Sequence, residues 1–136
     1  MNAKTVRVEI TTPIKKMTFN DAISVSAPGT EGSFQVLYNH APLMSQLEIG
    51  IIKLETEQGT MFFATSGGFC EVRENKVSLL LETCEKAQEI DAQRAAESAE
   101  RARKRLKEQR GHVDTARAEA SLARAMNRLR VSKKVN

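Results

Sequence analysis

Aromatic residues and cysteines are scarce in this chain of 136 residues, which has no tryptophan, one tyrosine, five phenylalanines and two cysteines. All six aromatic residues lie within the first 69 positions, so large core side chains are predicted only in the N-terminal part. Cys70 and Cys84 are too few for a disulfide framework and have no metal-ligand spacing. We expect both to be buried strand or strand-end residues in a reducing compartment.

Long apolar runs and catalytic patterns are also missing. No segment approaches the roughly 18 apolar residues of a membrane span, and the start lacks a signal-peptide core. His40 and His112 lie in separate segments without an acid or nucleophile at a recognisable spacing. Ser66-Gly67-Gly68 lacks the ending of a phosphate loop and indicates a tight corner between strands. The sequence therefore predicts a soluble, noncatalytic protein without a metal site.

Charge divides the chain into two different parts. Residues 1–84 contain seven Lys and Arg against nine Asp and Glu, a net charge of −2. Residues 85–136 contain fourteen against eight, a net charge of +6. Such a basic segment is typical of proteins that bind nucleic acid, a membrane surface, anionic nucleotides or an acidic partner.

Short runs of alternating or continuous apolar residues predict strands throughout the first part. Gln58-Gly59 and Glu74-Asn75 are expected to be hairpin turns between such runs. We predict about eight or nine strands, at residues 5–10, 22–27, 34–37, 43–48, 51–55, 60–65, 69–73 and 76–81. This pattern favours an antiparallel β-sandwich, assigned to residues 1–85.

Residues 86–136 are predicted to form a two-helix antiparallel hairpin. The hexapeptide Ile90-Asp91-Ala92-Gln93-Arg94-Ala95 is matched 23 residues later by Val113-Asp114-Thr115-Ala116-Arg117-Ala118, and each copy opens a run rich in helix formers. Asp91 and Asp114 fit N-caps, and Ile90 with Ala95 fits a hydrophobic staple. The turn is expected around Arg110-Gly111-His112. The fold class is thus α+β, with two segregated parts.

Small side chains form the predicted apolar face of each helix. The first face comprises Ala92, Ala95, Ala96, Ala99, Ala102 and Leu106, and the second comprises Ala118, Leu122, Ala125, Met126 and Leu129. Alanine buries little apolar area, so the hairpin is expected to be marginally held and able to open. Each helix also carries an arginine stripe with spacing i, i+7, i+11, formed by Arg94, Arg101 and Arg105 and by Arg117, Arg124 and Arg128.

Four motifs taken in order resemble the epsilon subunit of F-type ATP synthases. They are Gly32-Ser33-Phe34-Gln35-Val36-Leu37-Tyr38-Asn39-His40-Ala41-Pro42-Leu43, Ser66-Gly67-Gly68-Phe69-Cys70-Glu71-Val72, Ile90-Asp91-Ala92-Gln93-Arg94-Ala95 and Arg124-Ala125-Met126-Asn127-Arg128-Leu129. The similarity runs from about residue 5 to residue 131. Tyr38-Asn39 departs from a frequent Pro-Gly in that family.

The resemblance implies a noncatalytic rotor subunit of a proton-translocating complex, on the cytoplasmic face of the cell inner membrane. Its sandwich would contact the gamma subunit and the c-ring, the ring contact being made by the loop Tyr38, Asn39, His40, Ala41 and Pro42. Its hairpin would permit ATP hydrolysis when folded and suppress it when extended into the alpha/beta catalytic head. The membrane would be reached only through the complex.

The resemblance also implies ATP as a regulatory ligand of the folded hairpin. The corresponding residues are Glu85, Ile90, Asp91, Arg94, Ala95, Arg101, Arg117, Arg124 and Arg128. Guanidinium groups donate bidentately to phosphate oxygens, and carboxylates accept hydrogen bonds from ribose hydroxyls or the adenine amino group.

Other interpretations of the same residues remain open. The hexapeptide is also a helix-start pattern, as its second copy illustrates. The stripes are equally compatible with solvated faces or with acidic patches of the catalytic head. A nucleic-acid-binding module is the alternative function, although residues 85–136 have no aromatic residue on which bases would stack.

Overall fold

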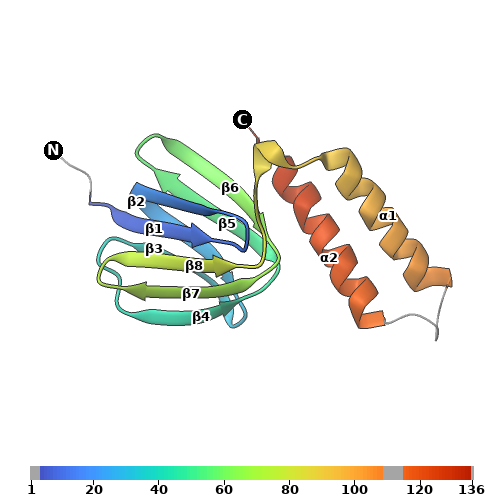
Figure 1. The fold of residues 1–136 in the computed structure, drawn as a ribbon, viewed down its shortest axis with the longest axis horizontal. Helices are drawn as coiled ribbons and strands as arrows, with labels where there is room; N and C mark the ends of the chain where they lie inside the picture. Colours follow the sequence, from blue (N-terminus) through green and yellow to red (C-terminus); the bar gives the residue numbers. More distant parts are fainter. Residues whose placement is uncertain (1–3, 109–114, 136) are drawn as a thin grey trace. The chain divides into compact units, whose positions relative to one another are not determined.

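The structure, a computed structural model, describes residues 4–108 and 115–135. It divides into two compact units, residues 1–86 and 87–136. Strands make up the first unit and helices the second (Figure 1), which confirms the predicted order of a β-sandwich followed by a helical hairpin. The predicted turn at residues 110–112 lies outside the described residues.

Nine strands form the described part of the first unit. Eight of them cover the predicted runs, but β9 and the first half of β2 are not predicted by the apolar pattern. The bounds are β1 (Val6–Thr11), β2 (Lys16–Gly29), β3 (Gly32–Leu37), β4 (Leu43–Leu47), β5 (Gly50–Thr56), β6 (Gly59–Thr65), β7 (Gly68–Arg73), β8 (Lys76–Leu81) and β9 (Cys84–Lys86).

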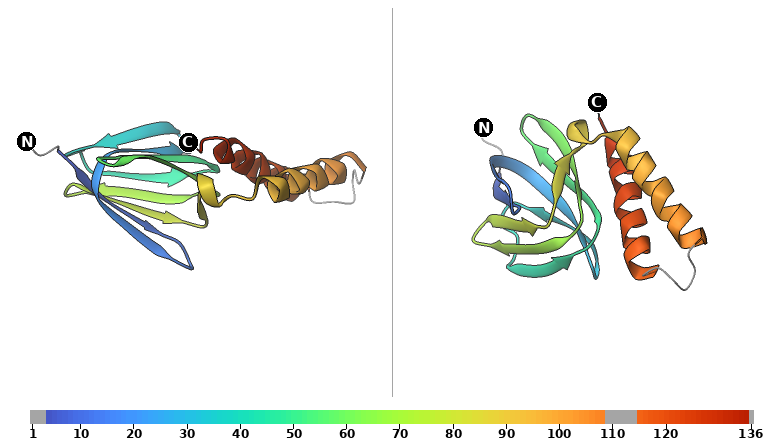
Figure 2. Two further views of the ribbon diagram at one scale, coloured as in Figure 1. Left: turned by 90° about the horizontal axis from the view of Figure 1, so that it is seen from above. Right: turned by 45° about the vertical axis from the view of Figure 1, so that its right-hand side comes forward.

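The long strand β2 belongs to both layers of the sandwich. Its first half pairs with β1, which continues through β8 and β7 to β4. Its second half pairs with β3 and β5, which continues through β6 to β9. Figure 2 shows these strands as two layers. The β1–β8 pair is parallel, whereas the other pairs of described strands are antiparallel.

The core lies between the two layers. Strands β1, β5 and β8 each bury alternate residues, as strands with one inward face do. The largest fully buried side chains include Ile10, Ile52, Leu54, Phe63 and Leu79. Cys70 and Cys84 are also buried, as predicted, and the two are not joined by a disulfide. Burial raises the pKa of Cys70 to about 11, so its reactive thiolate is disfavoured at neutral pH.

The second unit consists of a 3-10 turn, η1 (Ala87–Glu89), and the helices α1 (Ala92–Glu108) and α2 (Thr115–Ser132). The two helices lie side by side and antiparallel (Figures 1 and 2). Asp91 directly precedes α1, and its Oδ1 accepts a hydrogen bond from the backbone N–H of Arg94 at 3.1 Å. This confirms the predicted N-cap. The second predicted cap, Asp114, lies outside the described residues.

Alanines form the buried seam of the hairpin, but the seam is narrower than the apolar pattern predicts. Ala95, Ala99 and Ala102 on α1 and Ala118 and Ala125 on α2 are buried. The predicted inclusion of Ala92 and Ala96 is wrong, since both are exposed. They lie roughly 60° and 100° around α1 from Ala95, and one partner helix covers only a narrow strip.

Candidate functional site

The first hexapeptide places a carboxylate and a guanidinium at the start of α1. The cap bond fixes Asp91 beside the exposed N-terminal backbone groups, and Arg94 projects one turn further on. Ile90 is 9% exposed and Ala95 is fully buried. Both positions of the predicted hydrophobic staple are therefore buried, and the contact between their side chains stays a prediction.

Both arginine stripes occupy the same position relative to the buried alanines. At about 100° per residue, Arg94, Arg101 and Arg105 lie roughly 80–120° to one side of Ala95. Arg117, Arg124 and Arg128 lie at the same offsets, with the same sign, from Ala118. Residues with equal offsets from the seam fall on the same side of an antiparallel helix pair. The two stripes therefore share one side of the hairpin, which we call the arginine face.

A contact between the helices on the opposite side supports this arrangement. Arg103 and Met126 have equal offsets of roughly 80° in the other direction from Ala95 and Ala118. The Arg103 guanidinium Nη2 lies 3.1 Å from the Met126 sulfur, so these equal offsets do meet across the helix pair. The same rule places the arginine stripes together on the remaining side.

The Arg103–Met126 contact also sets the level of each arginine along the hairpin. Moving forward along α1 corresponds to moving backward along α2 by the same rise. Arg101 is therefore level with Arg128, and Arg105 is level with Arg124. Arg94 lies seven residues before Arg101, about 10 Å along the axis at 1.5 Å per residue. The face thus has a cluster of four arginines and a separate Asp91–Arg94 end.

Positive charge predominates on the arginine face. Between the arginines its helical positions carry Ser98 and Ser121, and Glu100 and Glu119 lie on the other side. Glu108 borders the face and lines a hollow with Arg101, Lys104 and Arg105. Arg101 donates to the Ser98 hydroxyl at 3.1 Å. Five of the six arginines are exposed and Arg128 is half-buried. Clustered guanidinium groups that outnumber the neighbouring carboxylates attract an anion with several charges.

Arg117 and Glu85 are the other charged residues predicted to hold the ligand. Arg117 lies near the start of α2, about 10 Å along the axis from Arg124. Glu85 is half-buried in β9, where its backbone is in register with Ala64 of β6, and it belongs to the first unit. Its predicted role at a nucleotide stays a prediction.

The predicted ring-contact loop between β3 and β4 is mostly exposed. Tyr38, Asn39, Ala41 and Pro42 are exposed, and His40 is half-buried with its Nδ1 2.7 Å from the Ala41 carbonyl oxygen. Asn39 has a φ of 59°, a left-handed conformation that Asn tolerates better than most residues. The loop therefore presents side chains on a defined backbone.

Asn75 positions this loop, a role that the sequence interpretation does not assign. Its side-chain Oδ1 accepts from the Asn39 backbone N–H at 2.8 Å, and its Nδ2 donates to the Thr5 carbonyl at 2.9 Å. Glu74 and Asn75 have φ values of 50° and 59°, which confirms the predicted tight turn. The turn was recognisable from sequence, but its contact across 36 residues was not.

The described ranges contain no group of three or more His, Cys, Asp or Glu residues arranged to hold a metal ion. Neither helix, over its described residues, is long and apolar enough to span a membrane.

Known protein families match both units. Residues 5–87 match the beta-sandwich domain of the ATP synthase delta/epsilon chain, and residues 88–133 match its long alpha-helix domain. The chain is 43% identical over 128 residues to the ATP synthase epsilon chain of Nitratidesulfovibrio vulgaris, covering 94% of this chain and 96% of that protein. It is 47% identical over 106 residues to that of Pelotomaculum thermopropionicum, covering 78% and 79%.

A solved structure shares the fold. A chain in the Euglena gracilis mitochondrial ATP synthase, OSCP/F1/c-ring, superimposes with a TM-score of 0.79 at 23% identity, covering 92% of this chain and 79% of that one. The two family models together span nearly the whole chain, and both relatives have the same name. The chain therefore belongs to the delta/epsilon chain family of ATP synthases.

Proposed function

We propose that this chain is the noncatalytic epsilon subunit of an F-type, proton-translocating ATP synthase. Its β unit attaches to the gamma subunit and the c-ring, so the chain turns with the central stalk. The exposed loop held by Asn75 is the ring contact, and the assembled complex lies on the cytoplasmic face of the inner membrane. Family membership and 43% identity to an epsilon chain support this assignment.

The hairpin restrains ATP hydrolysis by the complex. In the closed form the helices pack together and hydrolysis proceeds, whereas in the extended form they enter the alpha/beta catalytic head and suppress it. The alanine seam supports this role, because it buries much less apolar area than a leucine seam would. A small free-energy difference between two packings is what a two-state element requires.

ATP stabilises the closed hairpin as a regulatory ligand. The single observation that carries this proposal is the arginine face, where Arg101, Arg105, Arg124 and Arg128 outnumber the one bordering carboxylate, Glu108. The triphosphate binds the cluster, and the ribose or adenine is held at the Asp91–Arg94 end, about 10 Å away. Opening the hairpin separates the arginines of α1 from those of α2 and destroys the site.

Calorimetric titration of the full chain with ATP tests the ligand. We expect saturable binding that Arg124→Ala abolishes, because the cluster loses a phosphate donor and the closed pair loses its link across the helices. Arg130→Ala is the matched control, since this exposed arginine lies on the other side of α2. Equal loss in both variants would indicate attraction by net charge and contradict a defined site.

ATP binding also predicts a measurable stabilisation. A ligand that binds only the closed hairpin contributes RT ln(1 + [L]/Kd), about 2.7 kcal/mol at one hundred times Kd. Hydrogen exchange of the α1 and α2 amides should slow accordingly when ATP is added. Unchanged hydrogen exchange of these amides at saturating ATP would contradict the proposed coupling between ATP binding and hairpin closure.

Truncation after Glu89 tests the inhibitory role separately. The shortened chain retains every described strand, so we expect it to assemble into the complex. Removal of the hairpin should raise the rate of ATP hydrolysis by that complex. Normal assembly with unchanged hydrolysis would remove inhibition from the proposal and leave the stalk role intact.

A nucleic-acid-binding module is the second candidate function, favoured by the same arginine face. A gel shift at physiological salt distinguishes it. We expect no shift, because the described helices present no aromatic side chain for stacking.

A further inference from the structure

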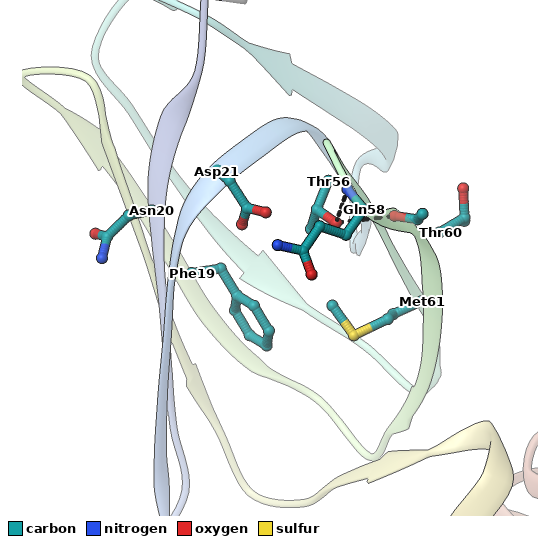
Figure 3. Close-up of a pocket in the computed structure, with 8 residues that line it drawn as sticks. Phe19, Asn20, Asp21, Thr56, Gln58, Thr60 and Met61 are labelled. Carbon is teal, nitrogen blue, oxygen red and sulfur yellow. Dashed lines mark hydrogen bonds between the residues drawn. The ribbon is translucent and has the colours of Figure 1, made fainter.

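A cavity of 630 Å³ opens between β2 and the β5–β6 hairpin, wholly within the first unit (Figure 3). Phe19 and Asp21 of β2 line one wall, and Gln58 and Met61 line the other. Figure 3 shows the Phe19 ring and the Asp21 carboxylate directed into this space, toward Met61 and Gln58. None of the proposed stalk or hairpin functions uses these side chains.

Two irregularities in β2 explain why these side chains face the cavity. Val6 pairs with Ala22 and Val8 with Phe19, so three steps along β2 correspond to two along β1. Ala22 pairs with Thr56 and Ser24 with Glu55, so two steps correspond to one along β5. Such bulges bend a strand and redirect its side chains, and they are common beside binding sites.

The opposite rim is held by hydrogen bonds of the β5–β6 turn. Thr56 Oγ1 accepts from the Gln58 backbone N–H at 3.1 Å and donates to the Gly59 carbonyl at 3.0 Å. The Glu57 backbone N–H donates to the Asp21 carbonyl at 3.2 Å and ties the turn to β2. Both walls are therefore connected, and the cavity is formed before any ligand arrives.

Within the β2 wall of the cavity, the Phe19 ring has a fixed orientation. It packs edge-to-face against the buried Phe63, with ring centroids 6.5 Å apart and an interplanar angle of 64°. Its ring is only partly covered and remains accessible from the cavity. A fixed, accessible aromatic face attracts a cation through its quadrupole.

Charge in the cavity favours a cation as well. Within the residues that the structure describes, the Asp21 carboxylate has no ion-pair partner. Arg7, on the strand that pairs with this part of β2, is already paired with Glu9 at 3.1 Å. Residues 1–84 carry a net charge of −2, so the surrounding unit does not repel a cation.

We propose that this cavity binds a short aliphatic ammonium or guanidinium ion as a free small molecule. The charged head lies between the Asp21 carboxylate and the Phe19 ring, and the aliphatic carbons contact the Met61 thioether. The Gln58 side-chain carbonyl accepts a further hydrogen bond from the head group. A carboxylate, an aromatic face and an apolar wall are together the recognition elements that such an ion requires.

Calorimetric titration of the full chain with butylguanidinium and butylammonium tests the site. Both cations should bind saturably, and affinity should fall as salt rises, because the charge pair is open to solvent. Butanol and butyrate have the same carbon chain without the positive charge and should show no saturable heat. Equal binding of butanol would overturn the proposal, as would the absence of binding by both cations.

Three variants locate the ligand. Asp21→Asn should weaken cation binding at least tenfold, and Phe19→Leu about threefold, whereas Glu82→Gln removes an exposed carboxylate elsewhere and should change nothing. NMR shifts of the Phe19 ring on titration keep the test valid if a variant folds poorly. Binding that survives Asp21→Asn unchanged would overturn the site.

A capped Gly-Arg-Gly peptide distinguishes a free ion from a side chain of a partner protein. We expect it to bind no more tightly than butylguanidinium. Tighter binding of the peptide would overturn the assignment to a free small molecule.

Discussion

The two units of this chain are stabilised by different kinds of side chain. Between the strands lie fully buried isoleucine, leucine, valine and phenylalanine, including Ile52, Leu54 and Phe63. Between the helices lie Ala95, Ala99 and Ala102 facing Ala118 and Ala125. At about 25 cal/mol per Å² of apolar surface, the first set contributes much more per residue than the second. The β unit is therefore suited to be a scaffold and the hairpin to be a movable part.

Connectivity strengthens the contrast. The sandwich pairs strands distant in sequence, such as β1 with β8, and Asn75 bonds to Thr5 across 70 residues. The hairpin joins two helices that are neighbours in sequence, and the Asp91 cap of α1 is a local bond. Opening the hairpin thus breaks contacts within the second unit while every described strand pair remains.

The two units also differ in how their charged side chains are arranged. On the β unit, Glu9 accepts from both Arg7 and Lys76 at 3.1 Å, so one carboxylate lies between two cations of neighbouring strands. On the hairpin, six arginines collect on one face, with Glu108 at its border. The first arrangement pairs a carboxylate with two cations, whereas the second concentrates positive charge that attracts an anion.

The largest expected effect comes from truncating one leucine in each unit and comparing the loss of stability. Leu54→Ala should lower the free energy of unfolding of the β unit by about 2–5 kcal/mol, because it leaves a cavity in a fully buried position. Leu106→Ala, at a half-buried position of α1, should cost clearly less. Urea denaturation followed by amide exchange in each unit measures both. Equal costs would contradict the comparison.

A smaller effect is expected at the start of α1. Asp91→Ala should destabilise the helix by about 1 kcal/mol, because the Arg94 N–H loses its acceptor. Asp91→Asn keeps the capping oxygen and should retain helix stability while removing the charge. Exchange rates of the α1 amides separate the two variants, and equal acceleration in both would argue against a capping role.

At Asn75 the expected effect is local. Asn75→Gly retains the positive φ of the turn but removes the bonds to Asn39 and Thr5, each worth about 0.5–1.5 kcal/mol. Exchange of the Asn39 amide should accelerate, while amides of β5 should remain protected. Unchanged protection at Asn39 would show that the loop is held by other contacts.

Much of the fold could be predicted from sequence because its signals are local. Alternating apolar residues gave the strands, and Glu74-Asn75 and Gln58-Gly59 marked hairpins that the structure confirms. The first half of β2 could not be predicted so readily, since Met17 and Phe19 are its main inward apolar residues. The short β9 and the parallel β1–β8 pair depend on partners far away in sequence.

At the candidate site, too, local features could be predicted from sequence, whereas contacts between the helices could not. The spacing of Arg101, Arg105, Arg124 and Arg128 predicted a stripe on each helix, but not that both stripes share one side. That conclusion required the buried alanines to fix the seam and the Arg103–Met126 contact to fix the opposite side. The exposure of Ala92 and Ala96 could not be anticipated, because the number of neighbouring helices decides how wide the seam is.

The smallest expected effect concerns the paired charges of the β unit. The hydrogen bond from Lys76, with further attraction from Lys16 and Arg7, lowers the pKa of Glu9 against the opposing effect of its burial. Lys76→Met should therefore raise the pKa of Glu9, while Lys104→Met on α1 should leave it unchanged. An NMR titration of the Glu9 carboxyl carbon measures this pKa directly. Because the folded pKa is lowered, the stabilisation is present above the ordinary pKa of 4.5 for a glutamate in the unfolded chain, and it is lost as pH falls through the folded pKa. The difference in stability between wild type and Lys76→Met should accordingly be present at neutral pH and shrink in acid. If this difference in stability stayed constant at pH values where Glu9 is protonated, the effect of Lys76 would be assigned to packing of its aliphatic chain.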